Sequence, residues 1–507
     1  MISLAVAAAL AASAGGGVYQ STEITRNLDP SWQPGTYREF IRDAPMPVPL
    51  EVSIVVASEN SSADFVILME EGLSDTIGTF LLNQWVEDIQ LQGLAVEVQE
   101  LTYSTPTELR QHLQNMHQSG LQGAVLVGQL PVPWSTIDNS FLRYSETFPS
   151  DYYYMDLTGV WSDQWIGPPS QGNPGQDGVF DGWSGELEPE IYVSRILTDN
   201  LPASGDPAEL LRAYLERNHA WKDQGDTFPA CGLCYVDDDW ASSGPGFQAA
   251  MEELYGDVEL INEYSATCGT DYEENRLQGN LYTWISPFVH SSSQLHQWSP
   301  GPSTYWYEVE EIDPRARFYN LFACSNARFT EENHMGGIYT FGTGFGLSSV
   351  GSTKSGSMLS FSQFYEPIGD GGSIGEGYMA WWDYITSNGF TDWEKSWHLG
   401  MVLLGDPTLM PSWHQEGVAE PELAAVPGRF LLTASPNPCL ESVTFTAPVD
   451  ASGLLLLFDA AGRVLLEEPF NGPRASLSMR GLPRGVYVAR LDAGTLGSAS
   501  VLLVKAP

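Results

Sequence analysis

The chain has 507 residues, which is enough for two or three domains. A hydrophobic content of 43% and an aromatic content of 12% argue against global disorder, because they are ample for packed cores. The formal net charge of −42, from 64 acidic and 22 basic residues, argues against nucleic-acid binding, since such a surface repels the phosphate backbone.

The N-terminus has the form of an export signal. Residues 2–14 are apolar and end in Ala12-Ser13-Ala14, the small-x-small pattern of a cleavage site. We therefore predict a signal peptide over residues 1–14, followed by a proline-containing leader over residues 15–60. No later stretch reaches the roughly 18 apolar residues that a membrane helix needs, so no membrane span is predicted.

Residues 61–412 alternate strands with helices. Strands are predicted at 65–69, 94–101 and 123–127, with helices at 79–93 and 106–118 between them. A long aromatic and acidic insertion, residues 130–188, precedes a strand at 190–196 and a helix at 207–222. This order favours an α/β fold with a mostly parallel sheet and helices on both faces, in two halves at 61–228 and 229–412.

Two apolar runs in the second half each end in a reactive side chain. Residues 281–289 lead to His290, and residues 318–323 lead to Cys324. Residues just past the carboxyl ends of parallel strands line the ligand crevice. A thiol and an imidazole placed there can act as nucleophile and base, so a cysteine hydrolase is the leading hypothesis.

Further strands are predicted from residue 231 and at 347–351, helices at 248–254 and 375–386, and a buried segment at 338–343. Asp237, Asp238 and Asp239 follow the first of these strands, and a carboxylate there would orient the imidazole. His296, His334 and His398 are rival bases, of which His334 is predicted to lie in an exposed loop. The small residues after His290 and Cys324 leave backbone N–H groups for an oxyanion.

The insertion also holds candidate metal ligands. Asp151, Asp177 and Asp181 have oxygen-rich neighbours suited to Ca²⁺, although their spacing does not match an EF-hand, and a plain acidic surface loop explains them equally well. A thiol hydrolase itself requires no cofactor. The five cysteines form no zinc-binding pattern, and an odd count leaves at least one thiol unpaired.

The composition changes at about residue 412. Residues 413–428 form a linker rich in Glu, Ala and Pro, and residues 429–507 contain short alternating strands separated by turn signals. This pattern predicts a small all-β sandwich of Ig-like form.

Residues 60–412 resemble the gingipain family, caspase-fold cysteine peptidases of exported bacterial proteins. The resemblance is carried, besides the His290 strand, by AVLVG at 124–128, SDYYY at 150–154, EIYVSRI at 190–196, Ala323-Cys324 and LGDPTL at 404–409. It implies a caspase-like sheet, Cys324 as nucleophile, His290 as general base and Asp239 as the supporting carboxylate. It also implies an oxyanion hole built from the backbone N–H groups of Ser291 and Cys324.

The chain departs from the family at two places. The family has glycine on both sides of the histidine, where this chain has Val289 and Ser291, and residues 244–247 lack the carboxylate that gives some members arginine preference. Residues 349–356 match the loop beside the substrate pocket and bring in Thr353 and Lys354. Lys354 would favour an acidic side chain before the cleaved bond; the alternative is a solvated loop lysine.

The last domain resembles the C-terminal sorting domain of the type IX secretion pathway, through SPNP at 435–438, LFDAAGR at 457–463 and LPRGVYVARL at 482–491. This resemblance implies export through the periplasm to the cell surface or medium, with the secretion machinery as a partner. The leading interpretation is thus a secreted cysteine endopeptidase that acts on proteins or peptides. The alternatives are an inactive pseudo-peptidase that binds or processes surface proteins, and a carbohydrate-binding protein that uses the aromatic residues Trp161, Trp165, Trp183, Tyr305, Trp306 and Tyr307.

Overall fold

The computed structural model describes residues 32–60, 62–139, 144–164, 176–223, 228–264, 266–387, 389–414, 432–435, 439, 442–459, 463–493 and 498–505. The chain divides into two compact units, Met1–Glu416 and Gly417–Pro507. The predicted signal peptide, residues 15–31 of the leader and residues 415–428 of the linker lie outside the described residues.

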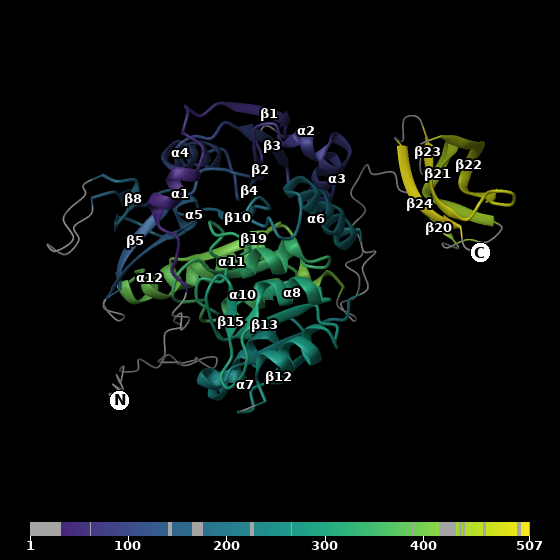
Figure 1. Ribbon diagram of the computed structural model, residues 1–507. Helices are drawn as coiled ribbons and strands as arrows, with labels where there is room; N and C mark the ends of the chain where they lie inside the picture. The colour runs from purple at the N-terminus through teal and green to yellow at the C-terminus, as the bar shows by residue number, and fades with distance from the viewer. Residues whose placement is uncertain are drawn as a thin grey trace. The chain divides into compact units, whose positions relative to one another are not determined.

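The first unit is built on an eleven-stranded sheet in the order β1-β3-β2-β4-β10-β19-β18-β17-β13-β11-β12 (Figure 1). The β1–β3 and β18–β19 pairs are antiparallel and the other neighbouring pairs are parallel, so the predicted mostly parallel α/β sheet is confirmed. The strands are β1 (Val52–Val56), β2 (Phe65–Glu70), β3 (Val96–Leu101), β4 (Gly123–Val127), β10 (Tyr192–Ile196), β11 (Cys231–Val236), β12 (Asp257–Ile261), β13 (Trp284–Phe288), β17 (Phe318–Asn320), β18 (Ser348–Ser352) and β19 (Met401–Gly405).

The central strands are continuous apolar runs because both of their faces are covered. All five residues of β4 and the first five of β2 are buried. Gly123 opens β4 where the Tyr192 ring crosses it, and a Cβ at this position would lie 2.1 Å from that ring. Only glycine allows this close approach.

Helices cover this sheet. The long helix α6 (Pro207–Lys222) packs against α3 (Thr79–Gln90), and α10 (Ser362–Gly369) packs against both α7 (Gly244–Met251) and α11 (Ile374–Thr386). Capping boxes start α4 (Pro106–His117), through Thr105 and Glu108, and α11, through Ser373 and Glu376. Each reciprocal pair satisfies backbone N–H groups that a helix start leaves open.

Several elements differ from the sequence-based expectation. Strand β1 lies in the predicted leader, and its edge pairing with β3 adds these residues to the sheet. The buried segment at 338–343 is a short π-helical turn, η3 (Ile338–Gly342). Elements β12, α10 and β19 were not predicted. The insertion contributes β5 (Trp134–Asn139), β6 (Tyr144–Pro149) and β8 (Val179–Phe180), which form a separate small sheet.

The second unit is all-β, as predicted. Its strands β20 (Thr433–Ser435), β21 (Ser442–Asp459), β22 (Val464–Ser478), β23 (Gly485–Asp492) and β24 (Ser498–Lys505) pair antiparallel in one sheet. Phe445, Leu457, Phe470 and Leu503 belong to its own hydrophobic core. The Ig-like sandwich form remains a prediction. Within the described residues, no helix has the length and apolar character to cross a membrane.

A buried carboxylate ties two helices to the end of β19. Asp406 accepts hydrogen bonds from Trp85 Nε1 of α3 at 2.8 Å, and from Asn218 Nδ2 and Lys222 Nζ of α6 at 2.9 Å and 2.8 Å. Lys222 and the other bonds hold the pKa of the Asp406 carboxyl below its usual range, against burial. Removal of the carboxylate would leave the Lys222 ammonium buried without its partner.

We therefore expect Asp406→Ala to lower the free energy of unfolding of the first unit by about 3–5 kcal/mol. Tryptophan fluorescence during urea unfolding reports on this unit alone, because all 16 tryptophans precede residue 417. Glu216→Ala, on the exposed side of α6, should change the same quantity by less than about 0.5 kcal/mol. Equal effects of the two substitutions would contradict the role given to Asp406.

Candidate active site

The carboxyl ends of β11, β13, β17 and β18 meet at one edge of the sheet, because these four neighbouring strands run parallel. Phe288 and Phe322 form a parallel bridge just past β17, and the Val289 N–H donates to the Phe322 carbonyl at 3.1 Å. His290 and Cys324 each come two residues later. The register therefore places His290 and Cys324 at the same level on two adjacent strands.

His290 is paired with Asp239. The His290 Nε2 and Asp239 Oδ2 atoms lie 2.8 Å apart, with the histidine 4% exposed and the carboxylate side chain 46% exposed. Asp239 belongs to the short helical turn η1 (Asp238–Ser243), which directly follows β11. The buried Trp240 ring packs 4.5 Å from the imidazole. A carboxylate in this position holds the imidazole ring in one orientation.

Cys324 is fully buried and lies at the start of a tight turn. The next residue, Ser325, has φ of 55°, a left-handed conformation that is unfavourable for a non-glycine residue. The turn is fixed by the Ser325 N–H, which donates to the Lys354 carbonyl at 2.9 Å, and by the Ala327 N–H, which donates to the Ser352 carbonyl at 3.0 Å. Backbone strain of this kind is found at functional sites, where surrounding bonds maintain it.

Lys354 and Thr353, the predicted pocket residues, lie in the buried loop that directly follows β18. The Lys354 ammonium donates to the carbonyls of Ser355 and Ser396 and lies 3.6 Å from Glu146 Oε2. Burial lowers the pKa of Lys354, while the charges of Glu146 and Cys324 oppose that shift. The alternative of a solvated loop lysine is wrong, because the side chain is 1% exposed.

The Thr353 hydroxyl donates to the Pro149 and Gly400 carbonyls, at 2.6 Å and 3.1 Å. Ser291, the predicted oxyanion residue, lies in the short strand β14 (His290–Ser291), which pairs with β15 (Leu295–Gln297). The Ser291 hydroxyl donates to the Ser292 and Leu295 carbonyls and so is engaged within the hairpin. The oxyanion role of its backbone N–H remains a prediction.

The rival histidines are buried, and burial lowers their pKa to about 3 for His296 and His398 and to about 4 for His334. The expectation that His334 lies in an exposed loop is wrong. It is 1% exposed, and its Nδ1 accepts the Gly337 N–H at 3.2 Å, capping the short helix α9 (Met335–Gly337). Of these four histidines, His290 is the one hydrogen-bonded to a carboxylate.

The three candidate calcium ligands have different surroundings. Both Asp151 carboxylate oxygens accept from Arg195, at 2.6 Å and 2.8 Å, in a fully buried ion pair. Asp181 accepts the Gln164 N–H at 2.8 Å, and the Asp177 N–H donates to Asp163 at 3.1 Å. The described residues contain no group of three His, Cys, Asp or Glu side chains able to hold a metal ion. Calcium binding stays a prediction.

The aromatic residues considered for carbohydrate binding differ in exposure. Tyr305 and Tyr307 are exposed and stack on each other, with ring centroids 5.3 Å apart, whereas Trp161 and Trp183 are half-buried. The rings of Trp161 and Trp183 lie 5.8 Å apart, and Trp161 also contacts Tyr153 and Phe180. Trp165 lies outside the described residues. Local packing accounts for Trp161 and Trp183.

One feature that sequence analysis missed is a hub at Glu331. Its carboxylate accepts hydrogen bonds from Trp32 Nε1 at 3.0 Å, from the Gly35 N–H at 2.8 Å and from the Ser293 hydroxyl. Arg328 contacts Glu331 at 3.1 Å and also donates to the Gly35 and Thr353 carbonyls. The N-terminal segment, residues 32–36, is thus tied to the loops that follow both His290 and Cys324.

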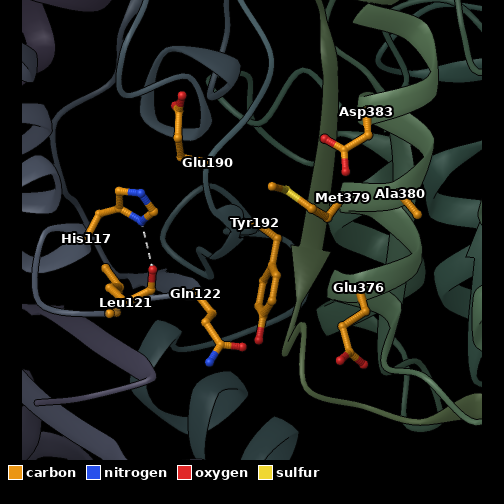
Figure 2. Close-up of a pocket in the computed structure, with 10 residues that line it drawn as sticks. His117, Leu121, Gln122, Glu190, Tyr192, Glu376, Met379, Ala380 and Asp383 are labelled. Atoms are coloured by element: carbon orange, nitrogen blue, oxygen red, sulfur yellow. Dashed lines mark hydrogen bonds between the residues drawn. The ribbon is translucent and has the colours of Figure 1, made fainter. Parts of the chain in front are cut away.

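A cavity of about 380 Å³ lies elsewhere in this unit, between residues 117–122 and α11 (Figure 2), and a second, of about 840 Å³, lies beside Glu331. The N-terminal segment forms one side of this second cavity, and Gln294, Glu331 and Glu332 form the other. The sequence predicts an exposed loop at His334, and nothing in the local sequence indicates the contact of Glu331 with Gly35, 296 residues away.

Solved structures similar to this chain include the crystal structure of the Arg-specific cysteine proteinase gingipain R, with a TM-score of 0.49 and 13% identity over 88% of this chain and 98% of that chain. The complex of the pro- and mature domains of RgpB from Porphyromonas gingivalis gives 0.47 and 13%, over 87% and 100% of the two chains. No protein-family model and no curated protein matches the chain. At these identities and TM-scores, neither activity nor substrate can be transferred.

The buried histidines predict an acid-sensitive fold. An unfolded histidine binds a proton below pH about 6.5, whereas His296 stays neutral in the folded state down to about 3. The unfolded state therefore binds more protons in this window, and stability falls as the pH is lowered, by about 1.4 kcal/mol per pH unit for each such group.

His296→Phe should reduce the slope of the unfolding free energy against pH, between pH about 6 and 4, by nearly the contribution of one proton, about 1.4 kcal/mol per pH unit. At neutral pH it should be tolerated, because neither ring nitrogen of His296 has a hydrogen-bond partner among the described residues and the ring lies among Tyr272, Trp298 and Tyr339. Urea unfolding at a series of pH values measures both quantities. A slope identical to that of the wild type would contradict the assignment.

Proposed function

We propose that the protein is a cysteine endopeptidase. The observation that carries the proposal is the hydrogen-bonded His290–Asp239 pair. His290 follows β13 at the same level at which Cys324 follows the adjacent strand β17. The sequence resemblance to the gingipain family assigns the same three residues to the same roles. A thiol, a base and a carboxylate that orients the base are the parts that nucleophilic acyl transfer needs.

In the proposed reaction, His290 takes the proton of Cys324, and the thiolate attacks the carbonyl carbon of a peptide bond. The tetrahedral intermediate carries its negative oxygen toward the backbone N–H groups of Ser291 and Cys324. It collapses as His290 gives the proton to the leaving amine, and a thioester remains. Water, deprotonated by His290, then hydrolyses the thioester and releases the second product and the thiol.

Two charged side chains support this chemistry. Asp239 accepts a hydrogen bond from the imidazole and so orients the ring. The Lys354 ammonium interacts electrostatically with Cys324. A positive charge beside a thiol favours the thiolate, which is the reactive form.

The thiol is buried, so a polypeptide reaches it only after part of its cover moves. The N-terminal segment that bonds to Glu331 and Arg328 is the candidate for this movement. It joins the two catalytic loops through a few polar contacts, and such contacts open more readily than a packed core.

We further propose that the enzyme acts outside the cytoplasm, on proteins or peptides. The support is the apolar segment with its small-x-small end at residues 12–14 and the sequence resemblance of the all-β unit to a type IX sorting domain. The secretion machinery would then be a partner of this second unit.

A specific pair of observations favours a second candidate, a pseudo-peptidase of the same fold that binds polypeptides without cleaving them. Cys324 is fully buried, and Ser291 stands where the family has glycine. Both features restrict the approach of a substrate carbonyl. A covalent probe separates this candidate from the enzyme.

A peptidyl acyloxymethyl ketone should label folded wild-type protein at Cys324 and should fail to label Cys324→Ala. Loss of the base in His290→Ala should lower the labelling rate by about 10²- to 10⁴-fold, and Asp239→Asn should also lower it, because the ring loses its orientation. Mass spectrometry of tryptic peptides gives the site and the rate.

Cys234→Ala is the matched control for this experiment. Cys234 is also fully buried, in β11, and burial raises the pKa of its thiol, so its removal should leave labelling unchanged. Absence of labelling in folded wild type would reject the peptidase and favour the binding protein.

Trp32→Ala should speed labelling of Cys324, because it removes one of the hydrogen bonds that hold the N-terminal segment on Glu331. The loss of a hydrogen bond to a charged group, about 1.5–3 kcal/mol, corresponds to roughly a tenfold or larger gain in the open population. Trp393→Ala, at an exposed tryptophan on α12 (Asp392–His398), is the control and should not change the rate. Labelling of Trp32→Ala at the wild-type rate would show that the segment does not limit access.

A further inference from the structure

Asn326 lies two residues after Cys324 and is fully buried. Its side-chain Nδ2 donates to the Leu321 carbonyl at 3.0 Å, and its Oδ1 accepts the Ser352 N–H at 3.3 Å. Leu321 directly follows β17, and Ser352 is the last residue of β18. One amide group therefore joins the ends of two neighbouring strands across the turn that begins at Cys324. We call these two side-chain hydrogen bonds the amide link.

The partners of the amide link fix its orientation. A carbonyl oxygen can only accept and a backbone N–H can only donate, so the nitrogen of the amide faces Leu321 and the oxygen faces Ser352. The backbone of Asn326 adds a third bond, because its carbonyl accepts the N–H of Gly336, in α9, at 2.8 Å. Asn326 is thus bonded to three separate segments of the chain.

Gly351 provides the space that the amide link occupies. A Cβ at position 351 would lie 2.5 Å from Asn326 Oδ1 and 2.8 Å from the Ala327 Cβ, and both distances are too short for a stable contact. A glycine inside a strand often marks such a close approach of another group. The glycine in β18 and the amide of Asn326 are therefore matched to each other.

The turn that the amide link spans has an unfavourable backbone conformation. Ser325, between Cys324 and Asn326, has φ of 55°, which a residue with a Cβ keeps only where the surrounding structure holds it. The amide link opposes relaxation of this backbone. A relaxed turn would move the Cys324 sulfur away from the level at which His290 follows the adjacent strand.

We infer that Asn326 is a positioning residue for the nucleophile, because its amide link holds the turn between β17 and β18 and so fixes the Cys324 thiol relative to His290. This inference rests on the proposed function, since it concerns the same reaction. Asn326 acts through the backbone of residues 321–327 and not on the substrate. A displacement of about 1 Å in a reacting group lowers a rate by up to about 100-fold.

Two substitutions disturb the amide link from opposite sides. Asn326→Ala removes the amide, whereas Gly351→Ala keeps it and places a methyl group in its space. Each should lower the limiting rate constant of Cys324 labelling, at saturating peptidyl acyloxymethyl ketone, by about 10- to 100-fold. The probe concentration that gives half of the limiting rate should change by less than about threefold, because a displaced thiol slows bond formation without removing contacts to the peptide.

Asn218→Ala controls for a general loss of stability. Asn218 is also fully buried in the first unit, and its Nδ2 donates to Asp406 at 2.9 Å. This variant should be destabilised in urea unfolding, as Asn326→Ala should be, and yet label at the wild-type limiting rate. Equal slowing of all three variants would overturn the inference, and so would wild-type labelling of folded Asn326→Ala and Gly351→Ala. If Asn326→Ala does not fold, Gly351→Ala decides the question.

Hydrogen exchange distinguishes a failure of this inference from a failure of the proposed function. Amide exchange in a peptic fragment that covers residues 321–329 should be faster in Asn326→Ala and Gly351→Ala, but not in Asn218→Ala, whether or not the wild type is labelled. Unlabelled wild type with this exchange pattern would reject the peptidase and support the amide link. Unchanged exchange in both link variants would overturn the inference even if the wild type is labelled.

Discussion

The register between β13 and β17 is the constraint on which the candidate site depends. The Phe288–Phe322 bridge places these two residues side by side, and each strand then continues for two residues to its reactive side chain. A shift of one residue in either strand would turn its side chains to the opposite face. The buried aromatic contact between Phe288 and Phe322, with ring centroids 5.2 Å apart, helps to fix this register.

The other parts of the site are attached to the same edge. Strand β11 is the next neighbour of β13 and delivers Asp239 to the imidazole. Strand β18 is the next neighbour of β17 and leads to Lys354, whose carbonyl accepts the N–H of Ser325, the residue after the thiol. Four consecutive strands thus contribute one chemical group each. Parallel sheets often concentrate function in this way, because all the loops at one edge come from carboxyl ends.

Much of this arrangement could be predicted from the sequence, because apolar runs ending in polar residues mark strand ends. The strand leading to His290, the strand leading to Cys324 and the helices α3, α6 and α11 were all visible as local patterns. The burial of Lys354 and His334 was not, because both sit in polar stretches whose cover comes from distant segments. The same reason hides the Glu331 hub, whose partners Trp32 and Gly35 lie about 300 residues away, 299 and 296 in sequence. Long-range pairing leaves no pattern in the local sequence, and the sequence did not predict β1 for the same reason.

A crystal structure of the protein captured by a peptidyl acyloxymethyl ketone would test the central claim most directly. We expect a thioether at Cys324 Sγ, with the imidazole of His290 within about 4 Å of the sulfur and the carbonyl oxygen of the adduct on the backbone N–H groups of Ser291 and Cys324. An adduct on a different cysteine, or an imidazole on the opposite face of the sheet from the sulfur, would contradict it.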